Sequence, residues 1–226
     1  MGAAISRALA RRGFAVAVHY STSQREADEL LAELRTAGHT AQAFAADLQV
    51  GEAPAKLVDQ VWEHFGRLDL LVNSAAVMER TPLGEVSVDE WDRIFALNLR
   101  APFLLSQAAA KRMGQGALIV NMADIAAFET WRGYIPHSVS KAGVVQLTKA
   151  LAHALAPRIR VNAIAPGVVM LPEGWPPESA ARLAATTPLR RTGSADDVTK
   201  ALEYLIDAEF VTGEVLVVDG GRLVRG

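Results

Sequence analysis

The sequence predicts an α/β protein of three layers, in which helices cover both faces of a doubly wound parallel sheet. Apolar runs of strand length alternate with segments of helical periodicity along the whole chain. The runs are continuously apolar, as in residues 117–120, which is typical of strands buried on both faces. Half of the 226 residues are hydrophobic and 21% are charged, so the chain can bury a sizeable core. We predict a single domain over residues 1–226.

The amino-terminal half begins with a helical segment and then alternates. The predicted strands are residues 14–20, 40–46 and 68–73. The predicted helices are residues 2–12, 24–36 and 54–65. Pro54 fits the first turn of its helix, and Gly13 and Gly66 each follow the last helical residue, where a left-handed glycine commonly ends a helix.

The carboxyl-terminal half continues the alternation. The predicted strands are residues 117–121, 159–164 and 215–218. The predicted helices are residues 88–112, 138–155, 178–185 and 194–206. Pro102 predicts a local adjustment inside the first of these helices, and Ser194 is a plausible N-cap for the last.

Composition excludes several classes of function. A formal charge of −2 gives no reason to expect nucleic acid or an anionic membrane as a partner. The absence of cysteine excludes disulfides and thiolate metal sites. No apolar run approaches the roughly 18–20 residues of a membrane span, and the first residues lack the basic start and apolar block of a signal peptide. We therefore predict a cytoplasmic protein without a metal site.

Three polar residues gather around the strand at 117–121. Asp124 would lie just past the carboxyl end of this strand, where open α/β sheets bind their ligands. His137 and Lys141 are four residues apart and would share one face of a helix. A carboxylate, an imidazole and an amine that converge there could form a proton-transfer site.

Five segments in chain order resemble the classical short-chain dehydrogenase/reductase family. The segments are VNSAA at Val72–Ala76, Asn98 within LNLRAPF, SKAG at Ser140–Gly143, VNAIAPG at Val161–Gly167 and VVDGG at Val217–Gly221. They are similar to the family's NNAG segment, the asparagine of its catalytic tetrad, the segment of its catalytic lysine, its N-x-(I/V)-x-PG segment and its VDGG segment. The resemblance covers nearly the whole chain and implies a Rossmann-like fold.

The resemblance implies an NADP(H)-dependent oxidoreductase that reduces a carbonyl or pterin-like small molecule, acting as a homo-oligomer (dimer or tetramer). It implies four catalytic residues, Asn98, Asp124, His137 and Lys141. The implied cofactor-binding residues are Gly2, His19, Tyr20, Ser23, Asp47, Leu48, Asn73, Ser74, Ala75, Lys141, Pro166 and Gly167. No acidic residue ends the strand at 14–20, where a carboxylate would bind the ribose 2′-OH of NAD, so NADP is favoured.

Within the family, the chain most resembles pteridine reductases. The shared features are HYSTS at His19–Ser23, NM-x-D at Asn121–Asp124 and the PG-x₃-L and PP stretch at Pro166–Pro177. Pteridine reductases have aspartate where the family usually has its catalytic serine. They also usually carry an aromatic residue near Met78, and methionine is a poorer platform for a flat ring.

The first departure from the family is His137, which stands where the Y-x-x-x-K pattern has tyrosine. Tyr134 is seven residues before Lys141 and therefore out of register. A histidine can also donate a proton, because its unperturbed pKa of about 6.5 suits neutral pH. The Lys141 cation would oppose protonation of His137, and Asp124 would favour it.

The second departure is at the amino terminus, where the family has a strand and a TGxxxGxG loop that holds the pyrophosphate. Gly2 resembles the last glycine of that loop, and the preceding strand is absent from the sequence as written. We expect a gap or a rearrangement between the strands at 14–20 and 68–73, and weak binding of NADPH. A misassigned start codon and genuine degeneration are the two alternatives.

Each site residue also has a structural alternative. Asp124 and Asp47 could be helix N-caps, Lys141 a surface lysine, and Asn73 and Asn98 backbone-bonding residues. Ser23 is expected to be both N-cap and phosphate ligand. Trp175 is either a lid over the substrate or a surface anchor. The alternative function is a catalytically impaired homologue that acts as a binding or structural subunit.

Overall fold

The computed structural model describes residues 1–169 and 176–224, and all its strand pairs are parallel. The strands are β1 (Val16–Tyr20), β2 (Ala41–Ala45), β3 (Leu70–Asn73), β4 (Ala117–Met122), β5 (Ile159–Pro166) and β6 (Val215–Val218). The α-helices are α1 (Gly2–Arg11), α2 (Gln24–Thr36), α3 (Ala53–Phe65), α4 (Val88–Phe95), α5 (Ala101–Ala110), α6 (Ile135–Leu155), α7 (Pro177–Thr186) and α8 (Ala195–Asp207). Shorter helical segments are η1 (Ala96–Arg100), η2 (Ile125–Ala127) and η3 (Arg222–Val224).

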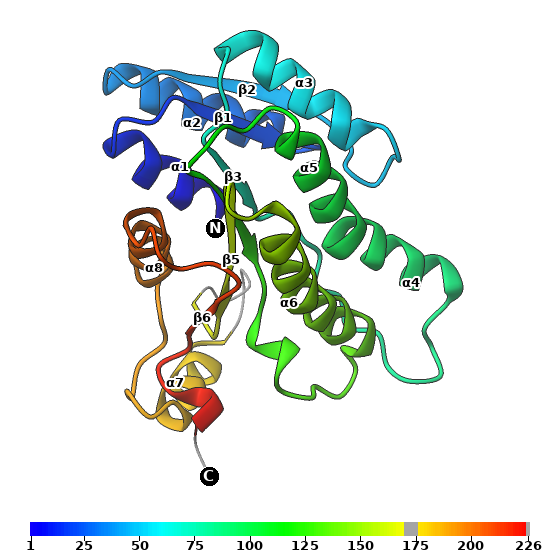
Figure 1. Cartoon of the computed structure of the whole chain (residues 1–226). Coiled ribbons are helices and arrows are strands. Elements are labelled where there is room, and N and C mark those ends of the chain that lie inside the picture. Colours follow the sequence, from blue (N-terminus) through cyan, green and yellow to red (C-terminus); the bar gives the residue numbers. More distant parts are fainter. Residues whose placement is uncertain (170–175, 225–226) are drawn as a thin grey trace.

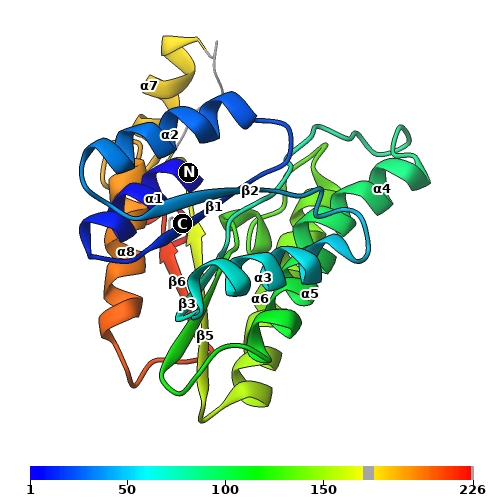
Figure 2. The ribbon, with the colours of Figure 1, turned by 90° about the horizontal axis from the view of Figure 1, so that it is seen from above.

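Helices lie on both sides of the strands, which confirms the predicted layered α/β fold (Figure 1). Helices α1, α2 and α8 lie on one side, and α3, α5 and α6 lie on the other (Figure 2). Alternate residues of β4 divide between the two cores: Leu118 and Val120 pack on the first side, and Ile119 on the second. All of β4 is buried, because helices cover it on both faces.

The strands form two sheets, one of order β1–β2 and one of order β3–β4–β5–β6. Within the described residues, β1 pairs only with β2 and β3 only with β4. This confirms the gap expected between the strands at 14–20 and 68–73. The gap leaves a cavity of about 1030 Å³ between β1 and β3.

Helix ends follow the local chemistry of the sequence. Gly66 takes a left-handed conformation after α3, as predicted. The Ser194 hydroxyl accepts a hydrogen bond from the Asp197 N–H in the first turn of α8, and the Asp197 carboxylate accepts one from the Ser194 N–H. The two bonds together form a capping box. Ser23 is a correction: it occupies the N-cap position of α2, but its hydroxyl makes no capping bond to that helix. Its ψ of 54° differs from the extended backbone that usually brings a cap oxygen to the helix amides.

Two predicted helices differ from the structure near the site. The single helix expected at 88–112 is divided into α4, the π-helical segment η1 and α5. A π segment accommodates an extra residue in a helix and is frequent at functional sites. Helix α6 begins at Ile135 rather than at 138, because Pro136 fits the first helical turn. No helix among the described residues is both long and apolar enough to cross a membrane.

Candidate active site

Asp124 lies just beyond the carboxyl end of β4, as predicted. Its Oδ1 accepts a hydrogen bond of 2.8 Å from the Ala126 N–H, so it caps the short helix η2. Its Oδ2 lies 3.9 Å from Nε2 of His137. One carboxylate oxygen of Asp124 therefore has the capping role given as its structural alternative, and the other faces His137.

His137 is buried in the first turn of α6, with 2% of its surface exposed. Its Nδ1 lies 3.2 Å from the Val77 carbonyl oxygen. A carbonyl only accepts hydrogen bonds, so this contact places a proton on Nδ1. Nε2 has no hydrogen-bond partner among the described residues, although it is buried. Nδ1 is therefore the nitrogen that is bound to the protein backbone, and Nε2 is the nitrogen that faces Asp124.

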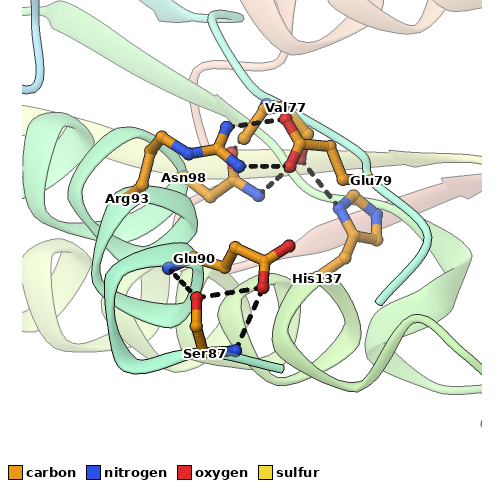
Figure 3. Close-up of polar contacts among 7 residues, drawn as sticks. All are labelled: Val77, Glu79, Ser87, Glu90, Arg93, Asn98 and His137. Atoms are coloured by element: carbon orange, nitrogen blue, oxygen red, sulfur yellow. Dashed lines mark hydrogen bonds and ion pairs between the residues drawn. The ribbon is translucent and has the colours of Figure 1, made fainter. Parts of the chain in front are cut away.

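Asn98 and His137 meet at the backbone of Val77, as Figure 3 shows. The Asn98 amide accepts from the Val77 N–H at 2.8 Å and donates to the Val77 carbonyl at 2.9 Å. It also donates to Ser140 Oγ at 3.1 Å, and the Ser140 hydroxyl donates to the His137 carbonyl at 2.7 Å. Through Asn98, the π segment η1 holds the Val77 carbonyl that contacts the His137 ring, and it also bonds helix α6, which carries His137.

Lys141 lies one turn after His137 on α6 and is buried, which excludes the alternative of a surface lysine. Its Nζ donates a hydrogen bond of 2.8 Å to the Met122 carbonyl at the end of β4. Burial lowers the pKa of the Lys141 ammonium to about 8, and the charge of Asp124 partly opposes this shift. The predicted catalytic residues on β4, η1 and α6 are therefore close together.

Trp131 is a neighbour of His137 that the sequence analysis did not identify. The two rings are nearly parallel, at 13°, with centroids 6.4 Å apart. The Trp131 indole N–H donates to Glu129 at 2.9 Å, and Glu129 pairs with Arg222 of η3 at 3.4 Å. No sequence motif marks these residues, since they meet through the turn after η2 and the carboxyl-terminal segment.

Pro166 is the last residue of β5, and Gly167 follows it. A Cβ atom at Gly167 would lie 2.8 Å from Cα and Cβ of Asp219, so no other residue fits without displacing the backbone. The Gly167 N–H also bonds the Val218 carbonyl at 2.9 Å. These contacts fix the path of the chain beyond β5. Residues 170–175, which include Leu171 and Trp175 of the predicted loop, lie outside the described residues.

Gly2, Ser74 and Ala75 line the cavity between β1 and β3. Gly2 begins α1, and the first bonds of this helix run from the Ala4 and Ile5 N–H groups to the Met1 carbonyl. The N–H groups of Gly2 and Ala3 therefore lack intrahelical partners, as at any helix start. The first turn of α1 has no acidic residue, so the positive end of its dipole faces no carboxylate from its own turn.

His19, Tyr20 and Ser23 lie at the carboxyl end of β1 and also line this cavity. The His19 Nε2 is 2.9 Å from the Ala46 carbonyl, which ties the ring to the segment after β2. Asp47 accepts from the Gln49 N–H at 3.0 Å, so it closes a turn, and the N-cap of α3 is Glu52. The alternative of Asp47 as a helix N-cap is therefore wrong. The Leu48 side chain is buried in the core.

Asn73 belongs to a buried network that the sequence analysis recognised only in part. Its Nδ2 donates to Ser106 Oγ at 3.2 Å and to Asn121 Oδ1 at 2.8 Å. Asn121 in turn donates to Thr148 Oγ1 at 2.9 Å. These bonds connect β3, β4, α5 and α6 through side chains, so Asn73 has a structural role, but its side chain bonds other side chains rather than the backbone expected in its alternative. Its Oδ1 is buried without a partner in the described part of the chain.

Comparison with known proteins gives consistent matches over almost the whole chain. The family profile described as Enoyl-(Acyl carrier protein) reductase matches residues 1–222. An uncharacterized oxidoreductase from Methylorubrum extorquens is 37% identical, over 98% of this chain and 92% of its own length.

Two solved structures show the same fold. A short-chain dehydrogenase/reductase from Serratia marcescens has a TM-score of 0.93 and 35% identity, covering 98% of this chain and 93% of its own. A short chain dehydrogenase from Burkholderia cenocepacia, solved in complex with NADP, has a TM-score of 0.92 and 32% identity, covering 98% and 92%.

Proposed function

The chain belongs to the short-chain dehydrogenase/reductase family, and from this premise we propose that it is an NADP(H)-dependent oxidoreductase that reduces a carbonyl or pterin-like substrate. The observation that carries the proposal is the buried Nε2 of His137, which has no hydrogen-bond partner among the described residues and faces Asp124 beside Lys141. A nitrogen in this state is suited to donate a proton to a bound oxygen. Open α/β sheets bind their ligands at the carboxyl ends of the strands, where these residues lie.

The residues at the carboxyl ends of the strands fit the nicotinamide half of the cofactor. Lys141 supplies a buried amine for the ribose hydroxyls, and Gly167 allows the backbone to pass close beside β6. When bound, the nicotinamide supplies the hydride that reduces the substrate carbon. The N–H groups at the start of α1, where the first turn has no acidic residue, are suited to bind the pyrophosphate half of the cofactor.

His137 supplies the proton in this scheme. With both ring nitrogens protonated, Nδ1–H stays on the Val77 carbonyl and Nε2–H is given to the substrate oxygen. The neutral ring that results carries its proton on Nδ1, which is the tautomer that the Val77 carbonyl already selects. Asp124, whose side chain is 24% exposed, faces Nε2 at 3.9 Å.

NADPH is proposed to bind more tightly than NADH. No carboxylate follows β1, and Ser21, Thr22 and Ser23 at this position are exposed and uncharged. A 2′-phosphate would meet no repulsion there. Titration of the chain with both cofactors, followed by nicotinamide fluorescence, measures the preference, and equal affinities would contradict it.

The pterin-like substrate is the finer part of the proposal, supported by the NM-x-D segment and by aromatic surroundings. Met78 is half exposed beside Val77, and Trp131 lies parallel to His137, so a flat ring would contact sulfur and an aromatic edge. A panel of carbonyl compounds and oxidised pterins, assayed by loss of NADPH absorbance, identifies the substrate class.

The test of the activity compares His137→Phe with the unchanged chain. Phenylalanine fills similar space and cannot donate a proton, so we expect turnover to fall by a factor of about 100 or more while the Kd for NADPH is retained. His137→Tyr should preserve or raise turnover. Turnover that is unchanged in His137→Phe would contradict the role of His137.

The alternative function predicts a different pattern in the same assay. A catalytically impaired subunit would bind NADPH without turning over any member of the panel. His137→Tyr would then create activity that the unchanged chain lacks.

The proposal includes three further properties. The chain forms one domain over residues 1–226, acts in the cytoplasm, and assembles as a homo-oligomer. Assembly is supported by exposed apolar side chains on α4, α5 and α6, namely Trp91, Phe103 and Val139. Light scattering of the purified chain measures its oligomeric state.

A further inference from the structure

The rim of the site consists of residues 77–81 and 131–134, two segments that lie side by side. The Thr81 N–H donates a hydrogen bond of 2.6 Å to the Gly133 carbonyl, which joins them. The carbonyl of the first rim residue contacts Nδ1 of His137, and the second segment leads directly into the helix that carries this histidine. The rim is therefore a continuous border beside His137.

Arg80 and Arg132 stand on the two segments of the rim, and both are exposed. We call them the arginine pair. The Arg80 side chain lies against the other segment, because a Cβ atom added to Gly133 would lie 3.5 Å from its Cγ and 3.6 Å from its Nε. Gly133 has a φ of 79°, a conformation that residues with a side chain rarely adopt. The Arg80 guanidinium thus lies beside the chain neighbour of Arg132.

The arginine pair has no partner among the described residues. Most arginines in that part of the chain donate to a carboxylate or a carbonyl, as Arg93 does to Glu79 (Figure 3) and Arg222 does to Glu129. These two ion pairs occupy the carboxylate of the rim and the one that precedes its second segment. Two neighbouring cations without a carboxylate repel one another, and a bound anion would relieve this repulsion.

An aromatic surface connects His137 to the arginine pair. The ring of Trp131 is nearly parallel to the His137 ring and packs edge-on against Tyr134, with centroids 6.2 Å apart. Trp131 is also the residue directly before Arg132. On the other segment of the rim, Met78 is half exposed. A substrate that extends from His137 toward the arginine pair therefore meets flat and apolar groups before it meets charge.

We propose that Arg80 and Arg132 bind an anionic group of the substrate, a carboxylate or a phosphate, at the end remote from the reacting carbonyl. The inference rests on the proposed reductase function and names its substrate class: a carbonyl compound with a flat body and an anionic tail. Guanidinium groups suit this task, since their fixed N–H donors match the oxygens of carboxylates and phosphates. The arginine pair determines specificity and takes no part in the transfer of hydride or proton.

Matched aldehydes test the proposal with the full chain and NADPH. We expect kcat/KM for para-formylbenzoate to exceed that for its methyl ester by at least about tenfold, mainly through KM. The two compounds share the ring and the reacting aldehyde and differ in charge. The compound para-formylphenyl phosphate distinguishes the two anions, because a site for phosphate prefers it to the benzoate and a site for carboxylate does not.

Variants of the arginine pair assign the preference to these residues. Arg80→Gln/Arg132→Gln should lower the ratio of acid to ester at least about tenfold, and each single variant should lower it in part. The ratio is insensitive to a general loss of folded protein, which lowers both rates equally. Arg11→Gln is the matched control and should keep the ratio. Arg11 is another exposed arginine without a partner in the described structure, and it ends α1 near the start of β1, away from the carboxyl ends of the strands.

Binding of terephthalate gives a readout that needs no turnover. This dianion keeps the ring and has no aldehyde, and its Kd from calorimetry should rise at least about tenfold in Arg80→Gln/Arg132→Gln. The neutral diamide of the same ring should bind the unchanged chain more weakly than terephthalate. Added salt should reduce this difference, because it screens exposed charges.

The outcomes separate this proposal from the reductase function. If the aldehydes are reduced, a ratio of acid to ester that is equal in the unchanged chain and in Arg80→Gln/Arg132→Gln overturns the anion site. If no aldehyde is reduced, the result counts against the reductase function. The Kd of terephthalate then decides the anion site, and an equal Kd in the two chains overturns it.

Discussion

Asp124 has two partners, one for each carboxylate oxygen, and a pair of substitutions separates its roles. Asp124→Asn keeps an oxygen that can accept from the Ala126 N–H but removes the charge that faces His137. We expect its stability to stay within about 0.5 kcal/mol of the unchanged chain while turnover falls by a factor of about ten or more. Asp124→Ala loses the cap as well and should cost about 1 kcal/mol. Urea denaturation and the NADPH assay measure the two effects, and equal turnover in Asp124→Asn would exclude a role for the charge.

Lys141 is the second residue whose charge can be tested, because burial lowers its pKa from 10.5 to about 8. Between these values the unfolded chain binds a proton that the folded chain has released, so stability rises with pH across this window. The expected gain is about 3 kcal/mol between pH 8 and pH 10.5. Below pH 8 the Lys141 ammonium stays charged in the folded chain, and the free energy of unfolding is lowered by the full cost of burying this cation.

Denaturation of Lys141→Met over the same pH range measures this contribution. The rise in stability should be absent in Lys141→Met and present in Lys111→Met, where the substituted lysine is exposed. Binding of NADPH to the unchanged chain should weaken above pH 8, as the ammonium loses its proton. A rise that persists in Lys141→Met would assign the pH dependence to another group.

At the scale of elements, the π segment η1 connects α4, α5 and α6 to the segment after β3. Asn98 makes this connection through bonds to both backbone groups of Val77 and to Ser140. Asn98→Ala leaves these buried groups without partners, and we expect a loss of about 2–4 kcal/mol of stability. Asn98→Asp keeps the acceptor for the Val77 N–H but turns an oxygen toward the Val77 carbonyl, so it should also be destabilised.

Urea denaturation measures this effect, with Gln107→Ala on the exposed face of α5 as the control. Hydrogen exchange at Val77 should accelerate in Asn98→Ala and stay unchanged in Gln107→Ala. Stability of Asn98→Ala equal to that of the control would show that Val77 is held by other contacts.

At the scale of the whole molecule, the two sheets differ in how firmly their inner edges are held. The amides of Ile119 and Val120 lie in a strand paired on both sides, whereas Ala17 and Leu70 line the cavity between β1 and β3. We expect the amides of Ala17 and Leu70 to exchange at least about tenfold faster than those of β4. Native-state hydrogen exchange measures the ratio. Equal protection would mean that β1 and β3 are covered in solution.

Much of the fold was predictable because the signals are local. Apolar runs and helical periods located all six strands, and glycine and serine at fixed positions located the ends of α3 and α8. The gap between β1 and β3 was predictable only from the family resemblance, which places a strand between residues 14–20 and 68–73. Pro102 predicted a local adjustment within residues 88–112, and the helix is indeed divided just before α5; the π segment itself, in which Asn98 bonds Val77, was not predicted.

The sequence by itself determined which residue types reach the carboxyl end of the sheet: Asp124, His137 and Lys141 follow from strand ends and helical spacing. Only the tertiary structure decided the tautomer of the His137 ring and the pKa of the Lys141 ammonium. The tautomer of His137 depends on a carbonyl 60 residues away in sequence, and the pKa of Lys141 depends on burial by several elements. Contacts to backbone groups and the degree of burial cannot be read from residue types. The contacts of His137 with the Val77 carbonyl and with the Trp131 ring therefore become visible only in the folded chain.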